Sequence, residues 1–361
     1  MLQKPKILVI KIGSNVLTKD GGQPDVGRMD SLVAQIASLR SEGIKILLVS
    51  SGAVAFGRGE ITLPEKTDPI LKKQIWASCG QIELINTYKK LFQKHTITIS
   101  QILVTKEDFR DRKHYLNMRN CLLGLIAQGI VPVINENDTV AITELMFTDN
   151  DELASLTAAM VNADSMVLLT NVDGIFDGNP SHPDSKLISL IGNKLPDLAE
   201  VINPVKSSFG RGGMLTKTTM AKKAAELGIQ VWIANGKKEN ILLDVFDQNA
   251  PSTFFEPNPR KQSPKKWLAH GDQYFKGEAV INDGAKLALA SNKISSLLPI
   301  GIISIKGDFT KGDIIRITDG NGTKIGLGKA EYPSTLAQEK IGLKNQKPFI
   351  HYDYLYLFQN G

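Results

Sequence analysis

The chain has 361 residues, of which 42% are hydrophobic and 22% are charged. These ordinary values exclude a largely disordered chain, and the length predicts two domains. The sequence contains no run of about eighteen apolar residues, so we expect no membrane-spanning segment. The N-terminal segment lacks the long apolar region of a signal peptide, and two cysteines are too few for a disulfide framework. Together these features predict a cytoplasmic protein.

The net charge of +6 is unevenly distributed along the chain. Residues 260–361 contain 15 Lys and Arg against 9 Asp and Glu, whereas residues 1–259 contain 28 of each kind. This asymmetry predicts a separate basic module at the C-terminal end. Four prolines between residues 251 and 264, mixed with polar and basic residues, predict a linker. We therefore expect a first domain over 1–255, a linker over 256–272 and a second domain over 273–357.

Short apolar runs alternate with longer amphipathic stretches in the first domain. Runs rich in Val, Ile and Leu that are flanked by helices indicate strands buried on both faces of a mainly parallel sheet, which is an α/β architecture. The expected strands are, in chain order, Ile7–Ile10, Ile44–Val49, Ile97–Val104, Ile130–Ile134, Met166–Leu169 and Ile229–Ala234. The expected helices are Val26–Glu42, Leu71–Phe92, Tyr115–Gln128, Asp151–Val161 and Met214–Leu227. In the second domain, short strands punctuated by Gly-Asp turns predict a small, mainly β barrel.

Small, polar or glycine residues follow five of the expected strands. In open α/β sheets, ligands bind beyond the carboxyl ends of the strands, so these residues predict a binding site. The segments are Lys11–Asn15, Ser50–Ala53, Asn135–Asp138, Thr170–Asn171 and Asn235–Gly236.

Two lysines are candidates for binding phosphate. Lys11 closes the first apolar run, where it is either an edge lysine that reaches solvent or a phosphate ligand. Gly13 favours the second interpretation, because it lets backbone N–H groups approach an anion. Lys217 follows a glycine-rich turn and falls in the first turn of the expected helix that begins at Met214. A cation opposes the helix dipole there, so a bound polyphosphate is favoured over a solvated lysine.

The loop over 148–152 carries more carboxylates than a helix start requires. Asp149 followed by Glu152 is typical of a capping box. The additional Asp151, together with Asn135 and Asp138, gives a polar cluster able to hold an amino-acid ammonium group and to orient lysines. The sequence contains no P-loop, dinucleotide-binding, protein-kinase, esterase or zinc-protease motif, and its five histidines are scattered without the spacing of metal ligands.

Several stretches in a fixed order carry a family resemblance. They are VIKIGSNVLT, VSSGAVAFGRG, ASCGQ, VPVINENDTVA, FTDNDELAS, LLTNVDGIF and GRGGMLTK. This set is similar to the glutamate 5-kinase family, and SSLLPIGI, GDF and KGD near the C-terminal end resemble a PUA domain. The resemblance implies an amino-acid kinase-like αβα sandwich with a mainly parallel sheet, followed by a small, mainly β PUA barrel. It further implies transfer of the γ-phosphoryl group of ATP, with Mg²⁺, to the γ-carboxylate of L-glutamate in the first step of proline biosynthesis.

The resemblance also assigns roles to individual residues. The implied catalytic residues are Lys11, Lys217 and Asp151, with Asp151 holding the two lysines. The implied glutamate-binding residues are Ser51, Asp138 and Asn150, with Asn135 and Asp149 as lesser candidates. The implied ATP-binding residues are Lys11, Gly13, Thr170, Asn171, Arg211, Gly212, Gly213, Met214, Leu215, Thr216 and Lys217. No metal ligand is assigned, because Mg²⁺ is expected to bind through the ATP phosphates.

The partners follow from the same resemblance, and two other functions stay open. The family implies a homo-oligomer and proline as a feedback inhibitor. Another enzyme of the amino-acid kinase fold, acting on an acidic amino acid or a nucleotide, is one alternative. RNA binding through the basic PUA module is the other, since phosphate contacts favour positive charge.

Overall fold

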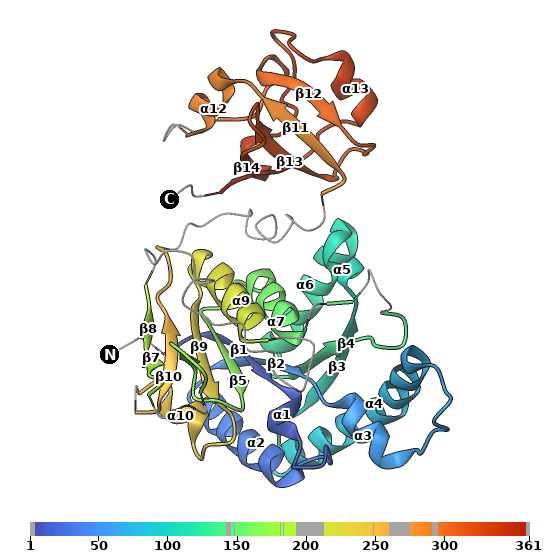
Figure 1. Cartoon of the computed structure of the whole chain (residues 1–361), viewed down its shortest axis with the longest axis vertical. Helices are drawn as coiled ribbons and strands as arrows, with labels where there is room; N and C mark the ends of the chain where they lie inside the picture. The colour runs from blue at the N-terminus through green and yellow to red at the C-terminus, as the bar shows by residue number, and fades with distance from the viewer. Residues whose placement is uncertain are drawn as a thin grey trace. The chain divides into compact units, whose positions relative to one another are not determined.

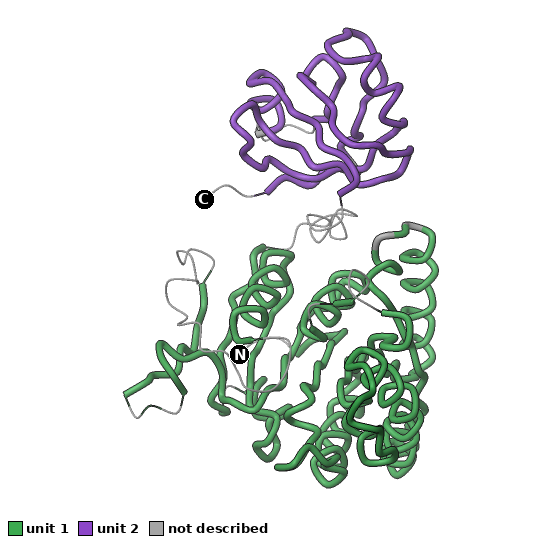
Figure 2. Tube along the Cα trace, turned by 45° about the vertical axis from the view of Figure 1, so that its right-hand side comes forward, with its two compact units in different colours: residues 1–260 green, residues 261–361 purple. Residues whose placement is uncertain are grey.

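The structure is a computed structural model that describes residues 4–141, 146–147, 149–180, 182, 184–192, 213–247, 249–259, 275–290 and 295–358. The chain divides into two compact units, Met1–Arg260 and Lys261–Gly361 (Figure 2). The predicted linker over 256–272 lies mostly outside the described residues. Its first residues belong to the first unit, because the N–H groups of Glu256 and Asn258 donate to the carbonyls of Ile191 and Ala225.

The first unit is built on an eight-stranded sheet with the order β3-β4-β2-β1-β5-β9-β10-β8 (Figure 1). Six neighbouring strands are parallel: β1 (Ile7–Ile12), β2 (Lys45–Ser50), β3 (Ile99–Val104), β4 (Val131–Glu136), β5 (Ser165–Thr170) and β9 (Gln230–Asn235). β10 (Ser252–Phe255) runs antiparallel to β9 and pairs with β8 (Leu190–Ile191). β6 (Ile175–Phe176) and β7 (Leu187–Ile188) form a separate antiparallel pair. The predicted α/β class with a mainly parallel sheet is confirmed.

Helices cover both faces of this sheet (Figure 1). One face carries α6 (Arg112–Ala127), α7 (Asn150–Met160) and α9 (Met214–Glu226), and the other carries α1 (Ser14–Leu17), α2 (Val26–Ser41) and α4 (Pro69–Gln93). The five long helices begin and end within three residues of the predicted bounds. Four short helices of the first unit were not predicted: α1, α3 (Ala53–Glu60), α5 (Lys106–Arg110) and α10 (Ile241–Asp244).

Side chains along β1 alternate between the two faces of the sheet. Leu8, Ile10 and Ile12 are buried in the core that the sheet forms with α2 and α4. Because successive side chains on a strand point to opposite faces, Lys11 lies on the other face, which α7 covers. β1 pairs with both β2 and β5, so Lys11 occupies a central strand. The alternative of an edge lysine that reaches solvent is therefore wrong.

Two glycines let α3 and α4 pack closely. A Cβ atom on Gly57 would lie 1.9 Å from the carbonyl oxygen of Trp76, and one on Gly80 would lie 1.9 Å from that of Ala53. Such distances are far below van der Waals contact, so both positions require glycine. These residues come from the VSSGAVAFGRG and ASCGQ stretches, and their packing fixes α4 beside the carboxyl end of β2.

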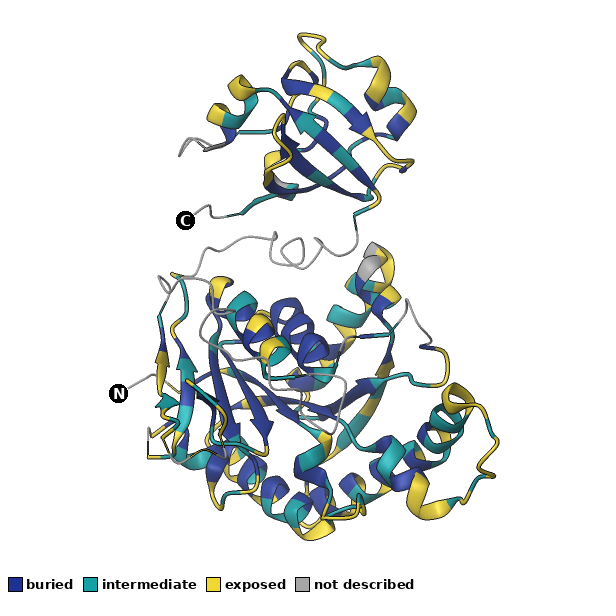
Figure 3. Ribbon diagram, viewed as in Figure 1, coloured by how far each residue is buried: buried dark blue, intermediate teal, exposed yellow. Residues whose placement is uncertain are grey.

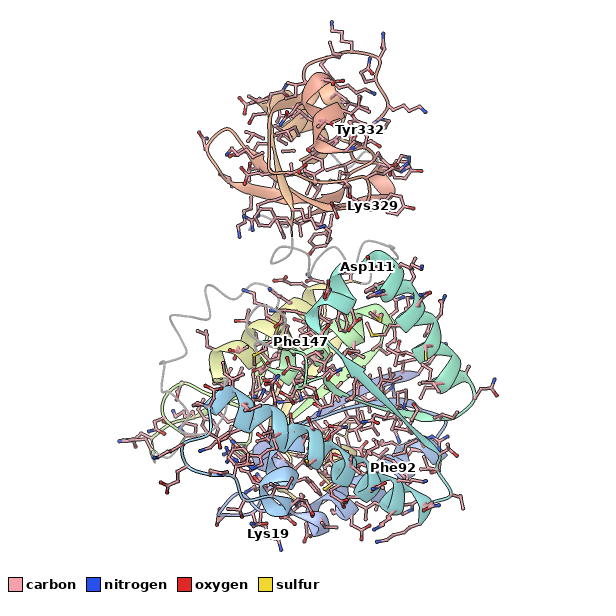
Figure 4. The ribbon with its side chains drawn as sticks, turned by 90° about the vertical axis from the view of Figure 1, so that its right-hand side faces the viewer. Lys19, Phe92, Asp111, Phe147, Lys329 and Tyr332 are labelled. Carbon is pink, nitrogen blue, oxygen red and sulfur yellow. The ribbon has the colours of Figure 1, made fainter. Side chains whose placement is uncertain are left out.

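The second unit is small and mainly β. Its five-stranded sheet has the order β12-β11-β13-β14-β15. The strands are β11 (Gly277–Ile281), β12 (Ile302–Lys306), β13 (Ile314–Asp319), β14 (Lys324–Lys329) and β15 (Leu355–Leu357), accompanied by helices α12 (Asp283–Ala290) and α13 (Ser334–Glu339) and the 3₁₀ turns η3 (Pro299–Gly301) and η4 (Tyr352–Tyr354). Phe349 lies at the centre of its core, with ring centroids 5.9 Å from Phe309 and 5.5 Å from Tyr332, which Figure 4 labels. Within the described part of the chain, no helix has both the length and the apolar character that a bilayer span requires.

Candidate functional site

One buried carboxylate connects the two lysines that the sequence singled out. The Nζ atom of Lys11 lies 2.6 Å from Oδ1 of Asp151, and the Nζ atom of Lys217 lies 2.5 Å from Oδ2 of the same side chain. The Asp151 side chain is fully buried, whereas those of Lys11 and Lys217 are 5% and 13% exposed. Side chains from β1, α7 and α9, which are far apart in the sequence, therefore meet at one point.

The start of α7 places Asp151 at the carboxyl edge of the sheet. Phe147, labelled in Figure 4, is buried and packs edge-on against Phe109, with ring centroids 5.7 Å apart. Its backbone N–H donates to Oε1 of Glu136 at the end of β4. Asp149 then begins the helix, because its Oδ1 accepts hydrogen bonds from the N–H groups of Asp151 and Glu152. The expected helix cap is confirmed, and α7 is buried along its whole length from Asp151 (Figure 3).

The charges of this triad are set by burial and by one another. Burial acts to raise the pKa of Asp151, but the two ammonium groups outweigh burial and hold that pKa well below its ordinary value. Burial lowers the pKa of Lys11, and the Asp151 carboxylate offsets this only in part. Burial also acts to lower the pKa of Lys217, yet Asp151 and Asp149 raise it overall. The neighbouring Lys217 ammonium also lowers the pKa of Lys11.

Asp149 holds a second carboxylate next to the triad. Its Oδ2 atom is buried and has no hydrogen-bond partner among the described residues. Burial and the neighbouring Asp151 carboxylate raise the pKa of Asp149 to about 6. A buried acceptor without a donor favours a ligand that brings its own N–H groups or cation.

Two of the predicted ATP-binding segments lie next to the lysines, namely Gly13 beside Lys11 and the start of α9 that carries Lys217. The N–H of Gly13 donates to the carbonyl of Leu169, and a Cβ at Gly13 would lie 3.5 Å from Nζ of Lys11, so glycine keeps that side of the ammonium open. Gly213 begins α9 without a side-chain cap, which leaves the N–H groups of residues 214 and 215 suited to an anion, whereas that of Thr216 donates to the carbonyl of Gly213. Thr170 is buried at the end of β5, and its Oγ1 lies 3.4 Å from Oδ1 of Asn171. Arg211 and Gly212 lie outside the described residues.

Three of the predicted glutamate-binding residues, Ser51, Asn135 and Asn150, form a second cluster. The Nδ2 group of Asn150 donates to Oγ of Ser51 at 2.8 Å, to Oδ1 of Asn135 at 3.0 Å and to the carbonyl of Ser50 at 3.1 Å. Oδ1 of Asn135 also accepts from a backbone N–H, and its Nδ2 group donates to Oε1 of Gln81. The ends of β2 and β4 are thereby tied to the start of α7. Asp138 lies in the turn after β4 and binds the ammonium group of Lys73.

Several residues near this edge of the sheet were not predicted from the sequence. Gln81 belongs to the ASCGQ stretch and Asp173 to LLTNVDGIF, so both had a signal within motifs already noted. Asp173 accepts from Nδ2 of Asn235 at 3.0 Å and from Nζ of Lys238 at 2.7 Å. Lys73 has no local signal, because its role depends on where α4 lies. The ion pair between Lys106 and the buried Glu152, at 3.3 Å, is likewise visible only in three dimensions.

These residues are suited to transferring an anionic group to an acceptor that has both a positively and a negatively charged group. Two ammonium groups and a helix N-terminus can hold phosphates, and hydroxyl, amide and carboxylate groups lie beside them. Among the described residues, no group of three His, Cys, Asp or Glu could hold a metal ion. Both oxygens of Asp151 already face lysines, so we expect a divalent cation to enter this site as a complex with substrate phosphates.

Comparison with known proteins identifies the family. The amino acid kinase family matches residues 6–235, and the PUA domain family matches residues 277–348. The chain is 48% identical to the glutamate 5-kinase of Bacteroides thetaiotaomicron over 360 residues, which cover 99% of this chain and 100% of that protein. It is also 48% identical to the glutamate 5-kinase of Chlorobaculum tepidum over 355 residues, which cover 97% of each.

Solved structures agree on the fold of the first unit. The UMP kinase of Ureaplasma parvum matches with a TM-score of 0.50 and 18% identity, over 70% of this chain and all of that chain. An isopentenyl phosphate kinase in complex with substrate matches equally well, with 19% identity and the same coverage. At this identity the similarity concerns the fold alone. The motifs, the kinase and PUA matches and the full-length relatives lead to one conclusion: this chain belongs to the amino-acid kinase family and, within it, to the glutamate 5-kinase family with a C-terminal PUA domain.

Proposed function

We propose that this protein transfers the γ-phosphoryl group of ATP to the γ-carboxylate of L-glutamate, giving ADP and L-glutamyl 5-phosphate as the first step of proline biosynthesis. The observation that carries the proposal is the buried pair of lysines on Asp151, beside the amide cluster around Asn150. Full-length similarity to glutamate 5-kinases supports the same substrate.

Both reactants are anions, so the site must first reduce their mutual repulsion. A carboxylate is a competent nucleophile at neutral pH and needs no general base, so catalysis consists of positioning and charge stabilisation. Lys11 and Lys217 stabilise the charge on the phosphoryl oxygens, and Asp151 holds both ammonium groups in place. The first-turn N–H groups of α9 and Gly213 face the phosphates, and Thr170, Asn171, Arg211 and Gly212 complete the nucleotide site.

The acceptor is held by the second cluster. Ser51, Asn135 and Asn150 orient glutamate through hydrogen bonds, while Asp138 and Asp149 bind its ammonium group. ATP enters as its Mg²⁺ complex, which supplies further charge neutralisation on the phosphates. We further propose, from family membership, a cytoplasmic homo-oligomer that proline inhibits by feedback.

A hydroxylamine trap tests the reaction class and the substrate together. An acyl phosphate reacts with hydroxylamine to give a hydroxamate and inorganic phosphate, so we expect an ATP-dependent signal with L-glutamate and none with aspartate or N-acetylglutamate. UMP forms no acyl phosphate and is followed by release of ADP. A signal with N-acetylglutamate or UMP, and none with glutamate, would show that the enzyme has a different substrate and would contradict the proposal.

Variants of the two lysines test their roles. Removing one group that stabilises transition-state charge costs about 10²–10³-fold in turnover, and we expect this loss in Lys11→Ala and Lys217→Ala. Lys94→Ala is the matched control, because this exposed lysine pairs with Asp30 on the surface. Near-normal turnover in either site variant, with folding checked by circular dichroism, would remove that lysine from the mechanism.

The basic C-terminal unit favours a second, accessory function, which is binding of structured RNA. The observations behind it are the PUA match over residues 277–348 and the excess positive charge of residues 260–361. Phosphate contacts make such binding fall steeply with salt, so titration of a structured RNA at several salt concentrations provides the test. If no RNA binding is detected at low salt, the RNA proposal is wrong, and the positive charge of residues 260–361 serves solubility or subunit packing.

A further inference from the structure

One face of α4 lies against the turn that follows β4. The ammonium group of Lys73 binds Oδ1 of Asp138, and Nε2 of Gln74 donates to the carbonyl of Thr139 at 2.7 Å. Further along the helix, Oγ of Ser78 lies 3.3 Å from Oγ1 of Thr139. The next turn of α4 carries the hydrogen bond to Asn135 that is described above. Lys73 is therefore held at the rim of the proposed glutamate site.

Glutamate brings three charged groups to this site. Its γ-carboxylate must meet the phosphoryl group near Lys11 and Lys217, and its ammonium group requires a carboxylate such as Asp138. Its α-carboxylate then needs a cation or strong donors, because a buried carboxylate without a partner is costly.

The described lysines next to the cluster leave one cation for this task. Lys11 and Lys217 are both held by Asp151, and Lys106 pairs with the buried Glu152. Lys73 differs from them, because its side chain is 29% exposed and its partner Asp138 is 12% exposed. Both groups of this pair keep some contact with solvent, so the charges of a substrate can reach them.

We propose that Lys73 binds the α-carboxylate of the amino-acid substrate while Asp138 binds its α-ammonium group. This inference rests on the proposed function and adds a specificity residue to it. A lysine and an aspartate side by side present the charge pattern opposite to that of a free α-amino acid. The pair thereby favours a substrate in which both α-groups are unmodified, since a neutral α-group would leave one charge of the pair without a partner.

The test compares L-glutamate with L-isoglutamine, which keeps the γ-carboxylate and the ammonium group but carries a neutral amide in place of the α-carboxylate. Lys73→Met preserves the length of the side chain and removes its charge. We expect kcat/KM for glutamate to fall about 10- to 100-fold, mainly through KM, because one charge-assisted hydrogen bond is lost. For isoglutamine we expect a change of less than about 2-fold. Isoglutamine is measured both as a substrate and as a competitive inhibitor, so its affinity is obtained in either case.

Two further variants serve as controls for the loss of charge at Lys73. Lys73→Arg keeps the cation and should retain most of the discrimination between the two compounds. Lys72→Met is the matched control, because the neighbouring ammonium donates to the carbonyl of Glu65 at 2.6 Å, away from the site. If Lys73→Met does not fold, as judged by circular dichroism, Lys73→Gln takes its place in the same comparison.

Other outcomes would overturn the proposal. If kcat/KM in Lys73→Met fell equally for glutamate and isoglutamine, Lys73 would only position Asp138. If the ratio of the two kcat/KM values stayed as in the parent protein, the α-carboxylate would be bound by other donors. A lower KM for glutamate in Lys73→Met would mean that the lysine competes with substrate for Asp138. Failure of the proposed function is a separate result, because the unmodified enzyme would then give no hydroxamate from glutamate at all.

Discussion

Replacing Asp151 by Asn should weaken both the fold and the reaction, while nucleotide binding is retained or strengthened. The substitution keeps the shape of the side chain and removes the single negative charge between two ammonium groups. Lys11 would then be a buried cation without a counter-ion. A bound triphosphate supplies negative charge at the same place, so ATP should stabilise this variant more than it stabilises the parent protein.

The magnitude follows from the two distances. Unit charges separated by 2.6 Å and 2.5 Å attract by about 6 kcal/mol each at an effective dielectric constant of about 20. The cost of removing these groups from water offsets much of this attraction. Breaking a buried ion pair by removal of one partner typically costs about 3–5 kcal/mol, and we expect the free energy of unfolding to fall by that amount.

Equilibrium denaturation with and without ATP measures the stability, and the hydroxamate assay measures turnover, which should fall by at least about 10²-fold. Asp30→Asn is the matched control. Its Lys–Asp pair has a similar length of 2.9 Å, but the two side chains are 43% and 56% exposed, so the loss should stay within about 0–1 kcal/mol. Asp151→Asn with parental stability, or with no stabilisation by ATP, would refute the bridging role of this carboxylate.

Three further substitutions test how residues around the site contribute to the stability of the fold. Gly80→Ala should lower the free energy of unfolding by about 1–3 kcal/mol, because the added methyl group meets a backbone carbonyl of α3, whereas Gly124→Ala in the open part of α6 should be neutral or stabilising. Burial and a neighbouring carboxylate raise the pKa of Asp149 from 3.8 to about 6, so the folded state binds this proton more tightly than the unfolded chain. Stability of the parent should therefore fall, relative to Asp149→Asn, as the pH rises from about 4 to about 6 in denaturation experiments. Tyr88→Phe removes the 2.8 Å hydrogen bond between the buried phenol and Oγ of Ser50, and chemical denaturation should show a loss of about 1 kcal/mol.

The sequence by itself determined the order of elements in the first unit and the edge at which its site lies. Buried parallel strands have a continuous apolar pattern, which locates them within one or two residues, and the polar residues that follow them must meet at the carboxyl edge. The cap at Asp149 and the start of α9 at Met214 are also local features, because they depend on residues within one helical turn. Short elements such as α3, α5 and the β6–β7 pair were missed, since few residues carry their pattern.

The residue patterns by themselves did not show which charges meet, although the family resemblance implied that Asp151 holds Lys11 and Lys217. From the sequence, Lys11 had two interpretations, and its place on a central strand facing α7 excluded the solvent-exposed one. The same holds for Lys73, which is an ordinary helical lysine until the close packing of Gly80 sets α4 beside Asp138. Partners separated by 65 to 140 residues have no local signal, because their approach depends on the packing of whole helices and strands. Local sequence therefore predicts which polar residues lie at the carboxyl edge of the sheet. The ion pairs between them form only when the whole unit is folded.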